Sequence, residues 1–251
     1  MHNTHPIALV TGANKGIGLQ IAKELASKGF KVLVGARRLA AGVAAAKSIG
    51  TDAQAIQLDV TDQASIAAAA KQIEATLGRL DVLVNNAGIS RPIKPGTPIE
   101  EMRAGDKVSL ASIEDLRVVF ETNVFGVVAV TQAMLPLLRK APAGRIVNIS
   151  SAGGSLTLKN NPSDYSRNYV GVYQTSKSAL NALTQAFAIE LEGTTVKVNV
   201  ACPGFTATEL SNYAPGAGSV EDAAREPVRL ALLGSHGPTG SFSNAAGPLP
   251  W

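Results

Sequence analysis

The 251-residue chain is 45% hydrophobic and 17% charged, so it can bury a core and fold as one domain. Its net charge of +4 is dispersed: the longest basic run is Arg37-Arg38, and aromatic residues make up only 4%. This composition argues against nucleic-acid binding. The single cysteine, Cys202, cannot form an internal disulfide, which is typical of a reducing compartment.

The first residues, MHNTHPIALVTG, contain no charged-then-apolar leader, and no apolar run approaches the ~20 residues that span a bilayer. We therefore expect a cytoplasmic protein that does not bind membranes. The histidines at 2, 5 and 236 have no other ligand types near them in the sequence, so we expect no metal site.

Strand-like and helix-like segments alternate along the chain. Short apolar runs that end at turns predict strands at 6–10, 30–35, 55–58, 80–84, 145–149 and 196–201. Apolar residues at helical spacing predict helices at 17–28, 40–48, 63–77, 113–139 and 172–190. This alternation predicts an α/β fold, a doubly wound parallel sheet in three α/β/α layers that forms a single domain over residues 1–251.

Two irregular stretches interrupt the alternation, at residues 89–112 and 152–171, and we interpret both as insertions near a substrate cleft. The Gly/Pro-rich region after Pro203 is a third segment for which we expect mobility rather than regular structure.

Three glycines, Gly12, Gly16 and Gly18, fall between the first predicted strand and helix. In such a turn, bare backbone amides approach a phosphate, and the helix dipole favours its negative charge. The spacing G-x-x-x-G-x-G differs from the commonest dinucleotide pattern, so a glycine-rich structural turn remains an alternative.

The end of the second predicted strand indicates which dinucleotide would bind. An NAD site usually has an acidic residue there for the ribose 2′-hydroxyl, but this chain has Arg37 and Arg38. Together with Lys15, these cations predict a cradle for the 2′-phosphate of NADP(H). The alternative is that both arginines are ordinary solvated surface residues.

Tyr173 and Lys177 lie four residues apart, on one face of a predicted helix. A nearby ammonium stabilises a phenolate, so we expect Lys177 to lower the pKa of Tyr173. Such a tyrosine can give a proton to a carbonyl oxygen or take one from an alcohol. The alternative is a surface aromatic residue beside a lysine.

Together these motifs resemble the short-chain dehydrogenase/reductase family, over nearly the whole chain. The family's nucleotide turn is resembled by Thr11-Gly12-Ala13-Asn14-Lys15-Gly16-Ile17-Gly18, and its adenine-contacting pair by Asp59-Val60. The signature after its fourth strand is resembled by Asn85-Asn86-Ala87-Gly88. The loop that meets the nicotinamide is resembled by Pro203-Gly204-Phe205-Thr206. Asn123, Ser151, Tyr173 and Lys177 match its catalytic residues. The resemblance implies a Rossmann-type fold that uses NADP(H).

The resemblance also implies a role for each catalytic residue. Ser151 would hydrogen-bond the substrate oxygen, with Ser150 as the alternative serine. Tyr173 would be the general acid, and Lys177 would hold the nicotinamide ribose. Asn123 would support a water that relays protons to Lys177. The cofactor would carry the hydride.

Two departures from the family pattern indicate a branch. Ser151 and Tyr173 are 22 positions apart instead of about a dozen, and the segment after Gly88 is longer than the family's short form. Both features resemble carbonyl reductases, so we expect NADPH-dependent reduction of a ketone or aldehyde. The alternatives are oxidation of a secondary alcohol or steroid-like substrate, and a non-catalytic NADP-binding protein.

We expect a monomer whose partner is a small carbonyl or alcohol substrate. In this prediction Leu156, Leu158, Tyr165 and Tyr169 fold back over the helix that carries Tyr173 and cover a face that otherwise pairs in dimers or tetramers.

Overall fold

The computed structural model describes residues 5–90, 107–164, 167 and 171–251. Its centre is one eight-stranded sheet with the order β3-β2-β1-β4-β5-β6-β7-β8. The strands are β1 (Ile7–Val10), β2 (Lys31–Ala36), β3 (Ala53–Gln57), β4 (Val82–Asn85), β5 (Arg145–Ile149), β6 (Lys197–Ala201), β7 (Phe242–Asn244) and β8 (Gly247–Pro248). All neighbours pair in parallel except β7 and β8. The predicted doubly wound parallel sheet is confirmed.

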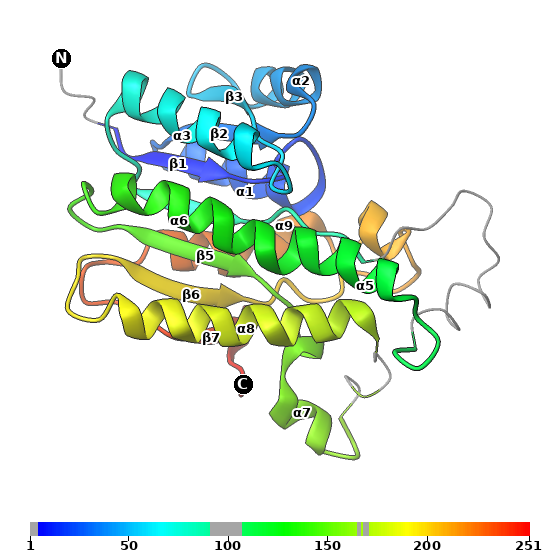
Figure 1. Ribbon diagram of the computed structural model, residues 1–251. Coiled ribbons are helices and arrows are strands. Elements are labelled where there is room, and N and C mark those ends of the chain that lie inside the picture. The colour runs from blue at the N-terminus through cyan, green and yellow to red at the C-terminus, as the bar shows by residue number, and fades with distance from the viewer. Residues whose placement is uncertain (1–4, 91–106, 165–166, 168–170) are drawn as a thin grey trace.

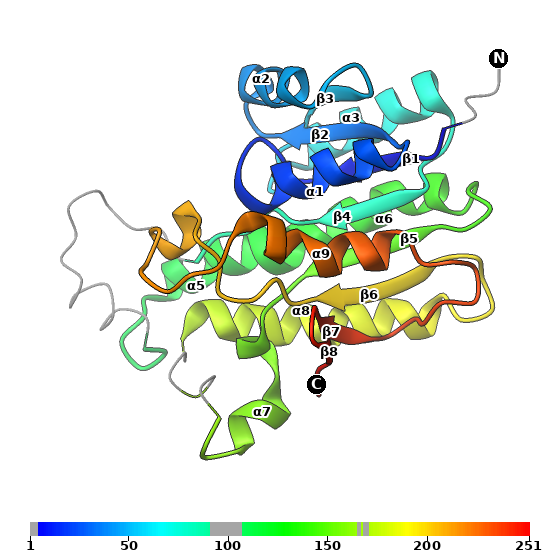
Figure 2. The same ribbon diagram turned by 180° about the vertical axis from the view of Figure 1, so that it is seen from behind.

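Helices cover both faces of the sheet. The helices and helical turns are α1 (Gly16–Ser27), α2 (Leu39–Ile49), α3 (Gln63–Leu77), α5 (Ile113–Phe120), η1 (Glu121–Phe125), α6 (Gly126–Leu138), η2 (Ala152–Gly154), α7 (Leu156–Asn160), α8 (Val172–Glu190), η4 (Glu209–Ser211) and α9 (Val220–Ala231). In Figure 1, α3, α6 and α8 lie in front of the sheet. Figure 2 shows α1, α2 and α9 on the opposite face.

The strands are apolar on both sides because each face of the sheet has its own core. Ile7 and Leu9 of β1 pack into the core beneath α3, α6 and α8. Ala8 and Val10 alternate with them and pack into the core beneath α1, α2 and α9. This two-sided burial explains why the sequence shows continuous apolar runs rather than alternation.

The predicted helix at 113–139 is interrupted. One turn of π-helix, η1, separates α5 from α6 and contains Asn123. Such π-turns often occur at functional sites. The stretch Ile113–Leu138 is apolar and long enough to cross a bilayer, but Val119, Val130 and Met134 on it are buried inside the protein. Its apolar character therefore serves the core.

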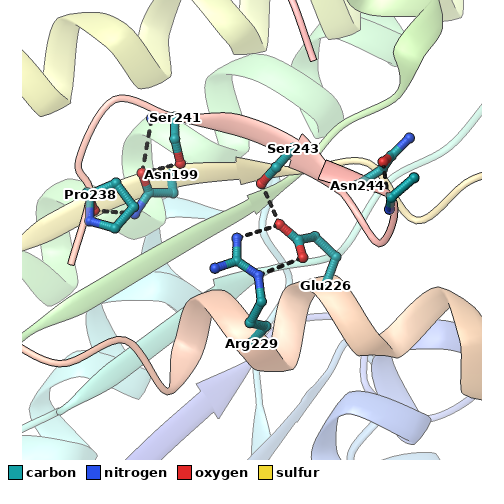
Figure 3. A network of polar contacts seen from close by, with 8 residues as sticks. Asn199, Glu226, Arg229, Pro238, Ser241, Ser243 and Asn244 are labelled. Atoms are coloured by element: carbon teal, nitrogen blue, oxygen red, sulfur yellow. Dashed lines mark hydrogen bonds and ion pairs between the residues drawn. The ribbon is translucent and has the colours of Figure 1, made fainter. Parts of the chain in front are cut away.

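The region after Pro203 contains more regular structure than we expected. It forms η4, α9, β7 and β8. Glu226 of α9 is buried, accepts a hydrogen bond from the Ser243 hydroxyl of β7 and forms a two-pronged contact with Arg229, at 2.7 and 2.8 Å (Figure 3). The hydrogen bond from Ser243 joins α9 to β7, the strand next to the end of the sheet.

Within the described part of the insertion at 152–171, Leu156 and Leu158 do not cover α8 in the way we predicted. Leu156 lies in α7 and is 63% exposed, while Leu158 packs beside Phe242 and Trp251. Hydrogen bonds to the last residues of the chain explain the place of α7: the Ser155 hydroxyl donates to the Pro250 carbonyl, and the Thr157 amide donates to the Trp251 carbonyl.

The covering role is therefore wrong for Leu156, and Ile189 of α8 stays exposed. Tyr165, Tyr169 and most of the insertion at 89–112 lie outside the described residues. The monomer stays a prediction.

Candidate active site

The turns that follow β1 and β4 are locked together at the carboxyl edge of the sheet. Gly12 has a φ of 62°, and a side chain there would meet the Ala87 Cα at 3.0 Å. The Thr11 hydroxyl accepts hydrogen bonds from the amides of Asn86 and Ala87, each at 3.0 Å. The side-chain nitrogen of Asn86, Nδ2, donates to the Thr11 carbonyl at 2.9 Å and lies where a side chain on Gly18 would clash. Glycine is required here by both conformation and space.

The glycine turn has the features that a phosphate needs. Gly16, like Gly12, is left-handed, with φ 57°, and the turn leads directly into α1. No side chain caps the first turn of α1, and no acidic residue lies in it. The free backbone amides and the helix dipole therefore suit an anion. Asn14 and Ile17 lie in the same turn, each half-buried. These residues fit the diphosphate of a dinucleotide.

The residues predicted to contact the adenosine end follow β2 and β3. Arg37 and Arg38 are exposed directly after β2, so their guanidinium groups are free of the core. Asp59 follows β3 and accepts hydrogen bonds from the amide and the hydroxyl of Thr61, at 3.0 and 2.7 Å. Val60 is buried beside it. All four residues lie on the same edge of the sheet as the glycine turn.

Asn123 is held by its side chain and is fully buried. Its amide nitrogen donates to the Ile89 carbonyl at 2.8 Å and to the Ser176 hydroxyl at 3.0 Å, and its amide oxygen accepts from the Ile89 amide at 2.9 Å. Ser176 in turn donates to the Tyr173 carbonyl at 2.6 Å. The π-turn of η1 is thereby fixed both to the loop after Gly88 and to α8.

Tyr173 and Lys177 lie together on the first turns of α8. The Lys177 ammonium is 5.5 Å from the centre of the Tyr173 ring and donates to the Ile149 carbonyl at 2.8 Å. A side chain on Gly88 would lie 3.6 Å from this ammonium and 3.3 Å from the Asn123 amide oxygen. The side chains of Asn123 and Lys177, both predicted catalytic residues, therefore both lie close to the backbone at Gly88.

Burial controls the protonation of both groups. It raises the pKa of the Tyr173 hydroxyl above its usual value, with a smaller contribution from the nearby Cys202. It lowers the pKa of Lys177 to about 8. We predicted a lowered tyrosine pKa, and the structure gives the opposite direction because burial removes the phenolate from water.

The two candidate serines face different environments. Ser150 is fully buried, and its hydroxyl donates to the Asn181 side chain at 2.6 Å. Ser151 is half-buried, and its hydroxyl oxygen accepts from the Gly153 amide at 3.1 Å, which leaves its proton free to donate. A side chain on Gly154 would lie 2.9 Å from the Lys177 backbone, so η2 packs directly against α8. The Ser150 hydroxyl is therefore used inside the core, whereas Ser151 keeps a hydroxyl proton available, and its role stays a prediction.

The loop after β6, residues 202–206, lies at the same carboxyl edge of the sheet as the other predicted site residues. Cys202 is buried and accepts a hydrogen bond from the Ala152 amide, and burial raises the pKa of its thiol. Pro203 is half-buried and Gly204 exposed. Thr206 is buried, and its hydroxyl contacts the Gly204 carbonyl at 3.3 Å.

Three contributors escaped the sequence analysis as individual residues. Thr11 locks the glycine turn, Ser176 links Asn123 to α8, and Glu209 forms an ion pair with Lys15. Thr11 lies in the glycine-turn motif and Ser176 lies between Tyr173 and Lys177, so a hydroxyl at either place was a usable sequence signal. Glu209 is distant in sequence and had none. Within the described part of the chain, no three His, Cys, Asp or Glu side chains form a group that could hold a metal ion.

Comparisons with known proteins agree with this arrangement. The sequence profile of the short chain dehydrogenase family matches residues 6–216. A short-chain dehydrogenase of Penicillium roqueforti is 39% identical over 244 residues, which cover 92% of this chain and 90% of that protein. The (-)-isopiperitenone reductase of Mentha piperita is 32% identical over 302 aligned residues, covering 94% and 95%.

A solved structure extends the similarity to three dimensions. Salutaridine reductase from Papaver somniferum superposes with a TM-score of 0.79 at 29% identity, over 95% of this chain and 99% of that one. Its similarity confirms the Rossmann-type fold that the motifs implied. The chain belongs to the short-chain dehydrogenase/reductase family, in a carbonyl reductase-like branch, and is an oxidoreductase.

Proposed function

We propose that this protein uses NADPH to reduce a ketone or aldehyde to an alcohol. The observation that carries the proposal is the grouping of Tyr173, Lys177 and Ser151 around the start of α8, at the sheet edge that also carries the glycine turn. When bound, the cofactor would supply the hydride to the carbonyl carbon. The protein would supply placement, a proton and stabilisation of charge on the carbonyl oxygen.

Tyr173 is the proton donor in this proposal. Because burial raises its pKa, the hydroxyl stays protonated at neutral pH. Its proton can then pass to the substrate oxygen as that oxygen gains negative charge, which leaves a phenolate on Tyr173. Ser151 donates a hydrogen bond to the same oxygen, since its own oxygen is already turned to the Gly153 amide.

Lys177 and Asn123 have supporting roles. The Lys177 ammonium stabilises the phenolate left on Tyr173 and has donors beyond the one used by the Ile149 carbonyl, so it can also hold a ribose hydroxyl. The Asn123 side chain has no free donor for a substrate because both of its amide protons are used. We therefore assign it to shaping the π-turn, where its backbone can hold the water that relays protons to Lys177.

The choice of NADPH over NADH follows from charge. The end of β2 offers Arg37 and Arg38 instead of an acidic residue, and Lys15 lies in the glycine turn. Guanidinium groups bind phosphate through paired hydrogen bonds, whereas an acidic side chain there would repel it. These three cations support recognition of the 2′-phosphate.

An apolar substrate fits the surroundings of the site. The segment after β6 exposes Phe205, Leu210 and Tyr213. Relatives include proteins named (-)-isopiperitenone reductase and (+)-neomenthol dehydrogenase. Such names support an apolar ketone, with the reverse oxidation as the alternative direction.

A panel of apolar ketones and aldehydes, assayed by absorbance loss at saturating NADPH and then NADH, tests the proposal. We expect turnover with at least one carbonyl and a higher kcat/KM for NADPH. Arg37→Asp should lower this preference by at least tenfold, because a charged hydrogen bond of ~1.5–3 kcal/mol is replaced by repulsion. Equal kcat/KM values for both cofactors in the wild type would overturn the NADPH assignment.

A further inference from the structure

An ion pair crosses the candidate cofactor site. The Lys15 ammonium, in the glycine turn, contacts the Glu209 carboxylate, 194 residues away in the sequence. Both side chains remain more than half exposed, at 58% and 60%. Glu209 begins η4, and its ion pair brings η4 to the turn before α1. The cation proposed for the 2′-phosphate is thus already paired with an anion from the chain itself.

Residues 206–213, which we call the lid segment, are folded independently of this ion pair. The Ala207 amide donates to the Gly218 carbonyl at 2.9 Å, which anchors the base of the segment. Thr208 and Ser211 form a reciprocal capping box, and the Tyr213 amide donates to the Thr208 carbonyl at 3.0 Å. Loss of the ion pair should therefore leave the segment folded.

Two contacts attach the lid segment to the glycine turn. One is the Lys15–Glu209 pair, and the other is close packing, since a side chain on Gly16 would lie 3.6 Å from the Thr208 methyl group. The first is electrostatic and chemically equivalent to a contact between Lys15 and a phosphate: both join an ammonium to an anionic oxygen. The second involves no charge.

We infer that Glu209 competes with the 2′-phosphate of the cofactor for Lys15, and is therefore a specificity-determining residue. This inference rests on the proposed NADPH function. When Lys15 turns to the 2′-phosphate, the lid segment loses its ion pair to the glycine turn. A nucleotide without a 2′-phosphate leaves the pair in place. Glu209 thus reduces the advantage of NADPH by the strength of one exposed ion pair.

The expected effect is modest because exposed ion pairs are weak. Removing the Glu209 charge should tighten binding of a 2′-phosphorylated ligand about twofold to fivefold. Binding of a ligand that lacks this phosphate should change by less than that.

Calorimetric titration with two fragments tests the inference without catalysis. The fragments are 2′,5′-ADP and 5′-AMP, which differ by the 2′-phosphate. They are titrated into the wild type, Glu209→Gln, Lys15→Gln and the double variant. Glu190→Gln is the matched control, because it makes the same change in net charge at an exposed position at the far end of α8.

We expect Glu209→Gln to tighten 2′,5′-ADP alone, and to do so only when Lys15 is present. Equal tightening of both fragments, an equal effect of Glu190→Gln, an effect that survives Lys15→Gln, or no effect would each overturn the inference. If the wild type prefers 2′,5′-ADP but Glu209→Gln changes nothing, the inference alone fails. If the wild type binds both fragments equally, the proposed NADPH preference fails with it.

Discussion

At the scale of single residues, burial of Tyr173 and Lys177 changes the proton affinity of both groups. It raises the pKa of Tyr173 and lowers that of Lys177 to about 8, in each case because a charged group loses hydration. The neutral tyrosine is suited to give a proton. With a pKa of about 8, the lysine loses its charge progressively as the pH rises through that value, and its support for a phenolate weakens with it.

The first prediction concerns pH. Reductive kcat/KM should fall as pH rises through about 8, because Lys177 then loses its charge. In Lys177→Met the fall of kcat/KM around pH 8 should disappear, and the residual activity should be lower at every pH. Profiles from pH 6 to 10 measure both. A wild-type profile that is flat between pH 7 and 9 would contradict the role of the ammonium.

The sequence indicated which residues form the candidate site better than it indicated their pKa values and hydrogen-bond partners. Tyr173, Lys177 and Asn123 were found from motif and spacing, and the structure brings them together. The direction of the tyrosine pKa was missed because burial depends on the whole fold. Ser150 and Ser151 are neighbours with the same chemistry, so only the structure separates the buried hydroxyl, which donates to Asn181, from the half-buried one, whose proton is available.

At the scale of elements, the π-turn and α8 are coupled through one hydroxyl. Ser176 accepts from the Asn123 side chain and donates to the Tyr173 carbonyl. Its hydroxyl therefore links η1, which is proposed to shape the water site, to α8, which carries the proposed acid Tyr173. Ser176 is a positioning residue, since it lies between them and is fully buried.

The second prediction is that Ser176→Ala lowers kcat about fivefold to tenfold and leaves the KM for NADPH within twofold. Loss of a buried hydrogen bond of ~1 kcal/mol, felt at the proposed acid, has this size. Ser178→Ala is the control, because its hydroxyl donates to the Gln174 carbonyl within the same helix, α8. Equal loss in both variants would indicate a structural effect alone.

Elements were predictable where local pattern and tertiary packing agree. Strands β1, β2, β4, β5 and β6 appeared as bounded apolar runs because they are buried on both faces, whereas β3 buries only Ile56 fully. The π-turn was missed because a single extra residue per turn hardly alters apolar spacing over 113–139. Helix α9 was missed because Pro227 lies inside it, and proline normally argues against a helix. There Ser219 caps the first turn and Ala224 and Leu230 are buried.

At the scale of the whole molecule, the end of the described chain is tied into the fold by a buried carboxylate. Glu226 of α9 holds the Ser243 hydroxyl of β7 and the Arg229 guanidinium (Figure 3). The Phe242 ring lies 5.4 Å from that of Trp251, which packs beneath the loop that carries Ser151. Residues 242–251 therefore pack against Ala152, which follows Ser151 directly in the chain.

The third prediction is that Glu226→Gln destabilises the protein by about 2 kcal/mol, because charge-assisted hydrogen bonds are lost in a buried place. The melting temperature should fall by about 4–8 °C. The control, Glu190→Gln, removes an exposed carboxylate and should leave the melting temperature unchanged. Calorimetry measures both, and equal melting temperatures for all three proteins would contradict this account.

The most direct test of the proposed function is Tyr173→Phe, which removes one hydroxyl and keeps the ring, Lys177 and the turn that would bind the cofactor. Single-turnover reduction of the best carbonyl substrate is followed by NADPH fluorescence, with NADPH affinity measured on the same samples. Tyr173 acting as the proton donor predicts a rate at least a hundredfold lower, at an NADPH affinity within about threefold of the wild type. A variant that binds NADPH normally and keeps most of the wild-type rate would contradict the assignment of Tyr173 as the acid.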